Sequence, residues 1–186
     1  MNRVERQLAV HGDPGAVPGA TRVLATVWRD DARLVYRLAL AGSGLVLPPA
    51  ADRPERRDDL WRATCAELFL ATEGADGYLE WNLSPSGHWN LYRFDAYRAG
   101  GRPEPAVAAA PRVTRAAGAC VVEATLPLAP LGLAAAPLLL GPAAVVAAAG
   151  GALSYWALAH PAPRPDFHDR RGFVLRLEPA AAAPEG

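Results

Sequence analysis

The amino-acid sequence predicts an all-β protein, folded as an antiparallel, jelly-roll-like β-sandwich of about nine strands. Three observations predict this fold. Short runs alternate between apolar and polar residues, clusters of Gly, Pro, Asp and Ser recur about every ten residues, and helical periodicity is nowhere sustained. The chain also lacks a glycine-rich nucleotide-binding motif and an alternating order of strands and helices, which disfavours an α/β fold.

The first predicted strands are residues 22–28 and 33–40, joined by a hairpin turn at two adjacent aspartates. In the second of these strands every other side chain is large and apolar, which is typical of a strand with one buried face. Residues 42–59 are rich in Gly, Pro, Asp and Arg and predict a loop. Residues 60–71 are apolar on both faces, so we expect one central strand there.

Residues 78–83 and 88–97 predict the best-defined hairpin of the chain. The turn between them is Ser84-Pro85-Ser86-Gly87, in which proline fixes φ and glycine supplies the permissive position. Both flanks are rich in aromatic residues, which favour strands.

Five further strand-like runs complete the predicted sandwich, at residues 112–115, 119–126, 143–149, 152–158 and 173–177. Residues 127–142 are interrupted by prolines and glycines, so we expect an irregular segment with one short helical turn there. The whole pattern predicts a single domain over residues 1–178, followed by a disordered tail at residues 179–186.

Composition narrows the partners and the compartment. The formal net charge of the 186 residues is zero, so no basic field favours nucleic acid or an anionic membrane, and we expect neither as a partner. The first residues lack the apolar run of a secretory signal, which predicts a cytoplasmic protein. Cys65 and Cys120 stand far apart in no metal-like spacing, so we expect two buried free thiols.

Strand alternation places the first group of candidate binding residues. Tyr78, Glu80 and Asn82 share one face of their strand, opposite an apolar face that belongs in the core. Glu67 lies in an otherwise apolar strand, where a buried carboxylate needs a partner such as Arg93. Aromatic rings can stack on a sugar while acids, amides and arginine bind its hydroxyls, so this face predicts a ligand groove. The alternative is that the tryptophans belong to the core and the Glu–Arg pair is a structural brace.

A second group lies in the proline-rich segment 160–170, which contains His160, Asp166 and His168. Its prolines hold these polar groups in place at low entropic cost, and a His–Asp pair could bind a metal ion or act as a base. The spacing specifies no third metal ligand, so we expect no metal site, and the side chains could instead cap backbone groups. The predicted ligand-binding residues are Trp61, Glu67, Tyr78, Glu80, Asn82, Trp89, Tyr92, Arg93, His160, Asp166 and His168.

Three motifs, in order along the chain, resemble bacterial DOMON-like domains, which are related in fold to family 9 carbohydrate-binding modules. The first is LWRATCAELFL at residues 60–70. The second is YLEWNLSPSG at residues 78–87, followed by an aromatic-rich run to Arg98. The third is YWALAHP at residues 155–161, with PDFH at residues 165–168. The resemblance covers most of the chain.

The resemblance implies a β-sandwich that binds a small ligand, a sugar or, in the wider group, a haem, without catalytic residues. We therefore expect a non-catalytic domain for a carbohydrate or sugar-derived ligand, with no resident cofactor. Alternatives stay open. One is a haem-binding domain that uses His88, His160 and His168, since the only methionine is the first residue and Met–His ligation is excluded. The others are a structural or interaction domain, and a hydrolase that uses Glu67 and Glu80.

Overall fold

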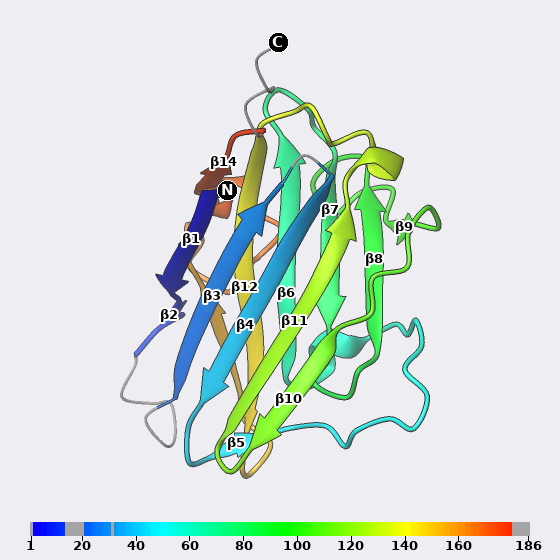
Figure 1. The fold of residues 1–186 in the computed structure, drawn as a ribbon. Coiled ribbons are helices and arrows are strands. Elements are labelled where there is room, and N and C mark those ends of the chain that lie inside the picture. Colours follow the sequence, from blue (N-terminus) through cyan, green and yellow to red (C-terminus); the bar gives the residue numbers. More distant parts are fainter. Residues whose placement is uncertain (1, 14–20, 31, 180–186) are drawn as a thin grey trace.

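Two antiparallel β-sheets pack face to face in the computed structural model, which describes residues 2–13, 21–30 and 32–179. The front sheet of Figure 1 has the strand order β1 (Asn2–Gln7), β3 (Arg22–Arg29), β4 (Arg33–Ala41), β11 (Ala119–Pro127) and β10 (Arg112–Ala116). The rear sheet has the order β2 (Ala9–Val10), β13 (Leu153–Ala157), β12 (Leu138–Ala148), β6 (Cys65–Thr72), β7 (Tyr78–Leu83), β8 (Trp89–Phe94) and β9 (Arg102–Pro103). The predicted antiparallel sandwich is thereby confirmed.

Short elements complete the rear sheet and its connections. Strands β5 (Leu45–Val46) and β14 (Leu175–Leu177) pair with different parts of β12. Single 3₁₀ turns form at η2 (Leu60–Arg62), η3 (Ala129–Leu131) and η4 (Arg170–Gly172). No helix in the described part of the chain is long and apolar enough to cross a bilayer. The tail expected at residues 179–186 lies, except for residue 179, outside the described residues.

The main apolar core lies between the two sheets, as strand alternation requires. In β4, Leu34, Tyr36, Leu38 and Leu40 point inward with at most 1% exposure, while the residues between them remain partly exposed. Trp81 of β7 is the largest fully buried side chain and reaches the same core from the rear sheet. The front sheet is therefore an ordinary one-sided sheet, with its other face toward solvent.

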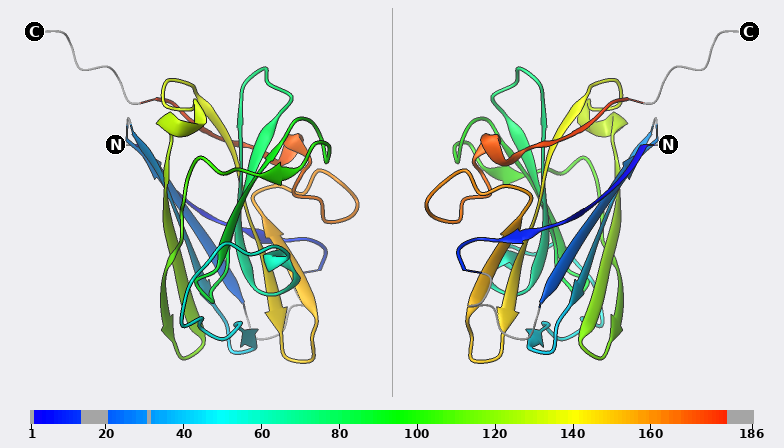
Figure 2. Two further views of the ribbon diagram at one scale, coloured as in Figure 1. Left: turned by 90° about the vertical axis from the view of Figure 1, so that its right-hand side faces the viewer. Right: turned by 90° about the vertical axis from the view of Figure 1, so that its left-hand side faces the viewer.

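The rear sheet differs because its central strands are buried on both faces. Every residue of β7 is buried, and in β6 only the last residue is partly exposed. A second, smaller apolar cluster lies on the side away from the front sheet, around Phe69, Tyr78 and Phe173. The connection from β13 to β14 covers that side, as the orange segment in both edge-on views of Figure 2 shows. We call residues 158–174 the covering segment.

Two expectations about strand boundaries are wrong. Residues 60–71 do not form one strand, because residues 60–62 make the 3₁₀ turn η2 and β6 begins at Cys65. Residues 127–142 are not irregular to their end, because β12 begins at Leu138 and runs through Gly141 and Pro142. On the side of β12 away from β6, β14 pairs with residues 138–140 and β13 with residues 143–147. Pro142 lies between these two pairings, so its missing N–H costs no ladder bond on that side.

The glycine in this strand has a packing reason. A Cβ atom at Gly141 would lie 2.9 Å from Cδ1 of Phe173, so only glycine lets the covering segment's ring approach the strand this closely. No sequence pattern predicts β1, because its residues are mostly polar; among the described residues it is an edge strand whose one partner is β3.

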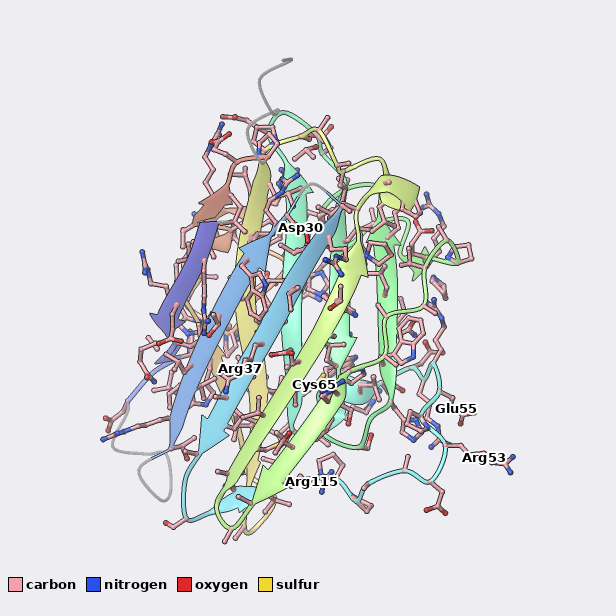
Figure 3. All side chains as sticks on the ribbon, in the orientation of Figure 1. Asp30, Arg37, Arg53, Glu55, Cys65 and Arg115 are labelled. Atoms are coloured by element: carbon pink, nitrogen blue, oxygen red, sulfur yellow. The ribbon has the colours of Figure 1, made fainter. Side chains whose placement is uncertain are left out.

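The long loop before β6, residues 47–64, is held to the rear sheet by Arg56. Its guanidinium lies 4.3 Å from the centre of the Trp89 ring. It donates to Asn90 Oδ1 at 2.8 Å and to the carbonyls of Leu91, Glu104 and Val107 at 3.3, 2.9 and 3.0 Å. The side chains of Arg53 and Glu55 project outward from this loop in Figure 3. We call residues 47–64 the η2 loop.

We expect Arg56→Met to lower the free energy of unfolding by about 2 kcal/mol or more, because buried carbonyls and an amide would lose their donor. Arg57→Met is the matched control, since Arg57 is exposed and, in the described part of the chain, its side chain pairs with Glu55 alone. Urea denaturation of both variants measures the difference. Equal midpoints for the two variants would contradict the anchoring role of Arg56.

Candidate functional site

A pocket of about 780 Å³ opens on the outer face of the rear sheet, away from the front sheet. Its floor consists of side chains from three neighbouring strands: Glu67 and Phe69 of β6, Glu80 of β7, and Tyr92 and Phe94 of β8. The strand register brings them together, since Phe69 lies opposite Glu80 and Glu80 lies opposite Tyr92. Side chains alternate between the two faces of a strand, and all five of these point to the outer face.

Two loops form the walls of the pocket. The η2 loop contributes Asp58, Asp59 and Trp61, and the covering segment contributes a wall that includes Phe167 and His168. In Figure 2 the η2 turn and the orange covering segment both flank the rear sheet. The complete lining is Asp58, Asp59, Trp61, Glu67, Phe69, Glu80, Tyr92, Phe94, Arg98, Val145, Tyr155, Arg164, Pro165, Phe167 and His168.

Backbone strain is concentrated at this pocket. Within the described residues, Asp59 (φ 59°) and Arg98 (φ 51°) are the non-glycine residues with positive φ, and both line the pocket. Such conformations cost free energy and persist where the surrounding structure holds them, which is often at binding sites.

The aromatic lining differs from the one that the sequence predicts. Of the five tryptophans only Trp61 lines the pocket, with 43% of its surface exposed. Trp81, Trp89 and Trp156 are buried in the core between the sheets. Trp89 is therefore corrected from a candidate ligand contact to a core residue, since strand alternation turns it inward beside Leu91. The rings that line the pocket are mainly phenylalanine and tyrosine, at positions 69, 92, 94, 155 and 167.

Glu67 is the most unusual group of the floor. It is only 3% exposed, and its Oε1 atom has no hydrogen-bond partner among the described residues. The predicted ion pair with Arg93 is wrong. Arg93 instead contacts Glu104, with 2.6 Å between Nε and Oε2. Arg93 belongs to the opposite phase of β8 from Tyr92, so its side chain leaves on the other face from Glu67.

Glu67 and Glu80 influence each other. Burial, and then the nearby charge of Glu80, raise the pKa of Glu67 well above its usual value of 4.5. Burial also raises the pKa of Glu80, while the hydrogen bond from Asn82 Nδ2 at 2.8 Å and the charge of Arg98 act in the opposite direction. Asn82 lies opposite Glu67 in the sheet, and its Oδ1 atom likewise has no partner in the described part of the chain.

His168 joins the covering segment to the floor. Its Nδ1 lies 2.7 Å from the hydroxyl of Tyr78, and that hydroxyl accepts the backbone N–H of Arg98 at 3.2 Å. The hydroxyl and Nδ1 share one hydrogen bond, and the tautomer of the ring decides which of the two donates. Nε2 lies 3.8 Å from Oε2 of Glu80, too far for a direct hydrogen bond.

The charge state of His168 follows from its surroundings. Burial, and then the positive charge of Arg98, lower the pKa of His168 to about 4, although Asp166 acts in the other direction. The ring is therefore neutral at neutral pH, and its contact with Glu80 is not an ion pair.

Asp166 fixes the covering segment and does not line the pocket. Its carboxylate accepts from Arg98 at 2.8 Å, from the Tyr97 hydroxyl at 2.5 Å and from the backbone N–H of His168 at 3.1 Å. His160 lies outside the lining as well, because its ring packs edge-on against His11 and contacts the carbonyl of Ala9 at 2.9 Å.

The histidines named for haem binding do not converge. His88 accepts the backbone N–H of Glu55 at 3.2 Å, and only His168 of the three lines the pocket. No cluster of three or more metal-ligating side chains occurs among the described residues.

Sequence reasoning identified part of the lining. Trp61, Glu67, Glu80, Tyr92 and His168 were named and line the pocket. Tyr78 and Asn82 bind the lining residues His168 and Glu80 directly. The missed residues are chiefly loop residues and rings, namely Asp58, Asp59, Phe69, Phe94, Arg98, Tyr155, Arg164 and Phe167. Alternation could have identified Phe69 and Phe94, because they point to the same face of their strands as Glu67 and Tyr92. No sequence pattern indicates the loop residues.

No protein-family model matches the chain. No curated protein is significantly similar to it in sequence.

Solved structures show the same fold at low sequence identity. A candidate carbohydrate-binding protein from Bacteroides uniformis superposes with a TM-score of 0.67 and 12% identity, over 92% of this chain and 84% of its own. A family 9 carbohydrate-binding module from Caldicellulosiruptor kristjanssonii in complex with glucose gives a TM-score of 0.54 and 12% identity, over 91% and 82%. The module from that organism in complex with cellotriose gives 0.55 and 12%, over 91% and 80%.

We expect the His168 ring to titrate with a pKa of about 4 in an NMR titration. Arg98→Gln should move this pKa upward, because the variant loses a positive charge that disfavours protonation of the ring. A His168 pKa at or above 6.5 in the unmodified protein would contradict the assignment of a buried, neutral ring.

The same shift predicts the pH dependence of stability. Because the folded-state pKa is below the usual 6.5, the unfolded chain binds the proton more readily. The stabilisation from His168 is therefore complete above pH 6.5 and is lost as the pH falls toward about 4. Thermal unfolding of the protein and of His168→Gln should show a difference that shrinks over this interval, and a constant difference would contradict it.

Proposed function

We propose that this protein is a non-catalytic binding domain for a small carbohydrate or sugar-derived ligand. The observation that carries the proposal is the pocket of about 780 Å³ on the rear sheet, which combines aromatic rings with four carboxylates and two arginines. Pockets of this size, with apolar walls and a few fixed polar groups, suit ligands of one or a few sugar units.

The arrangement of the lining supports a ring-shaped polar ligand. Arg62 covers one face of the Trp61 indole, with 4.8 Å between its guanidinium carbon and the ring centre. The residue is still 43% exposed at the pocket wall, so its other face can stack on the apolar face of a sugar. Asp58 Oδ1 accepts hydrogen bonds from Asn90 Nδ2 at 2.8 Å and from the Tyr92 hydroxyl at 2.5 Å. None of the described residues binds its second oxygen, so this atom can accept from a ligand hydroxyl.

The fold likeness points in the same direction. Two of the similar structures hold glucose or cellotriose, and the third is a candidate carbohydrate-binding protein. At 12% identity this likeness concerns the fold, and the pocket residues named above supply the chemical argument.

Binding without hydrolysis fits the position of the two buried acids. Glu67 and Glu80 come from neighbouring strands and the same face, so they form one floor. A glycosidase needs two carboxyl groups that flank the scissile bond, one as acid and one as base or nucleophile. We propose that the floor acids contact the ligand and do not cleave it.

Isothermal titration calorimetry against a panel of neutral monosaccharides, oligosaccharides and amino sugars tests the proposal. We expect binding to at least one of them, and Trp61→Ala should weaken it about ten-fold or more, because a stacking ring is lost. Trp28→Ala is the matched control, since Trp28 lies on the front sheet, with Arg3 over its ring. No heat change with any sugar at millimolar concentration, or equal losses in both variants, would contradict the proposal.

A hydrolase assay separates binding from catalysis. We expect no release of product from aryl glycosides or from any oligosaccharide that binds. Product formation that disappears in Glu67→Gln and Glu80→Gln would contradict the non-catalytic proposal.

A further inference from the structure

We propose that the natural ligand carries a protonated amine, and that the ammonium group binds against Glu67 and Glu80 on the pocket floor. The ligand class is then an amino sugar. This inference rests on the proposed function and specifies its substrate class.

The first support is the number of acidic groups in the lining. Acidic side chains come from Asp58, Asp59, Glu67 and Glu80, and the cations that line the pocket are the guanidiniums of Arg98 and Arg164. Arg98 is already bound by Asp166, with 2.8 Å between its Nη2 and the carboxylate. The pocket therefore offers a ligand more acidic side chains than basic ones.

The second support is where the unsatisfied acid lies. Asp58 accepts two hydrogen bonds on Oδ1, and Asp59 lies 3.3 Å from the guanidinium of Arg62. Glu67 has no such partner. It is 97% buried, it lines the pocket, and its Oε1 atom has no hydrogen bond within the described residues. A buried polar atom of this kind requires a partner, and the pocket is the cavity that Glu67 lines.

The titratable groups of the described residues next to Glu67 carry no positive charge. Glu80 is a second acid, His168 is a neutral ring, and the thiol of Cys65 is buried with a raised pKa. Tyr36, which approaches from the front sheet, is also neutral, because burial and Glu67 raise its pKa. Arg98 is close enough to Glu80 to influence its pKa, but its guanidinium is held by Asp166.

The third support is the surrounding rings. Phe69, Tyr92, Phe94, Tyr155 and Phe167 line the same pocket as the two acids. The faces of aromatic rings attract a cation, and this attraction strengthens where water is excluded. An ammonium group can donate three hydrogen bonds, so it can satisfy Glu67 and a neighbouring acid at once, whereas a hydroxyl donates one.

Binding of a cation should displace a proton. Burial and Glu80 hold the pKa of Glu67 well above 4.5 in the free protein, so it carries a proton to higher pH than an exposed glutamate. An ammonium group beside the carboxyl favours the ionised form and lowers that pKa. Affinity for an amino sugar should therefore rise as the pH rises above 4.5, as long as the amine stays protonated.

The experiment compares glucose, glucosamine and N-acetylglucosamine by isothermal titration calorimetry at about pH 6, where such an amine is protonated. Glucosamine should bind about ten-fold or more tightly than both neutral sugars, as a charge-assisted hydrogen bond predicts. Repeating the glucosamine titration in buffers of different ionisation enthalpy should show that a proton is released.

Variants then assign the preference to the floor acids. Glu67→Gln, which keeps the shape of the side chain, should bring glucosamine to within about three-fold of glucose while glucose binding persists. Glu80→Gln provides a second test should the first variant fail to fold. Glu123→Gln is the control, because Glu123 lies on β11 of the front sheet, and it should retain the full preference.

The outcomes separate the two proposals. Equal binding of glucose and glucosamine, or a preference that survives both floor variants, overturns the amino-sugar inference and leaves the proposed function standing. Binding of none of the three sugars, with no response across the wider panel, overturns both.

Discussion

Removal of Glu67 from water on the outer face of the rear sheet is the constraint on which the rest of the site depends. A carboxyl group buried without a partner is costly, and the free energy must come from elsewhere in the fold. Here the closely packed strands β6 and β7, together with the covering segment, bury the carboxyl group. The neighbouring acid Glu80 increases this cost, because two nearby carboxyl groups resist ionising together.

The covering segment makes this arrangement possible. Phe167 and Phe173 pack on the outer face of β6, and the carboxylate of Asp166 ties the segment to Arg98 and Tyr97 beyond β8. The segment therefore spans the sheet from β13 to the region after β8, and the pocket lies beneath and beside it. The outer face of a one-sided sheet, such as the front sheet, is exposed to solvent, so a carboxyl group there would remain hydrated.

Much of the fold could be predicted from the sequence, because alternation and turn chemistry act locally. The hairpin of β7 and β8 shows this, since Pro85 and Gly87 define its turn and the inward and outward sets of side chains follow by parity. The same parity identified Glu67 and Glu80 as floor residues. It also shows why the Glu67–Arg93 pair fails, because Arg93 lies in the other phase of β8 and finds Glu104.

The remaining features depend on long-range packing, which local patterns do not encode. Strand β12 can contain Pro142 because β14 pairs with the residues before the proline and β13 pairs with the residues after it. Strand alternation turns Trp89 inward, but the guanidinium that lies 4.3 Å from its ring centre comes from Arg56, in a loop far away in the sequence. The loop residues Asp58, Asp59 and Arg164 reach the pocket through tertiary contacts that no spacing in the sequence specifies.

Glu67 lies on the floor of the pocket, and its Oε1 atom has no hydrogen-bond partner among the described residues. The most direct measurement is a carbon-13 NMR titration of the Glu67 side-chain carboxyl in the free protein. We expect a midpoint well above 4.5, which falls when glucosamine is added. A midpoint at or below 4.5 in the free protein would contradict it, because the carboxyl would then be hydrated or already paired.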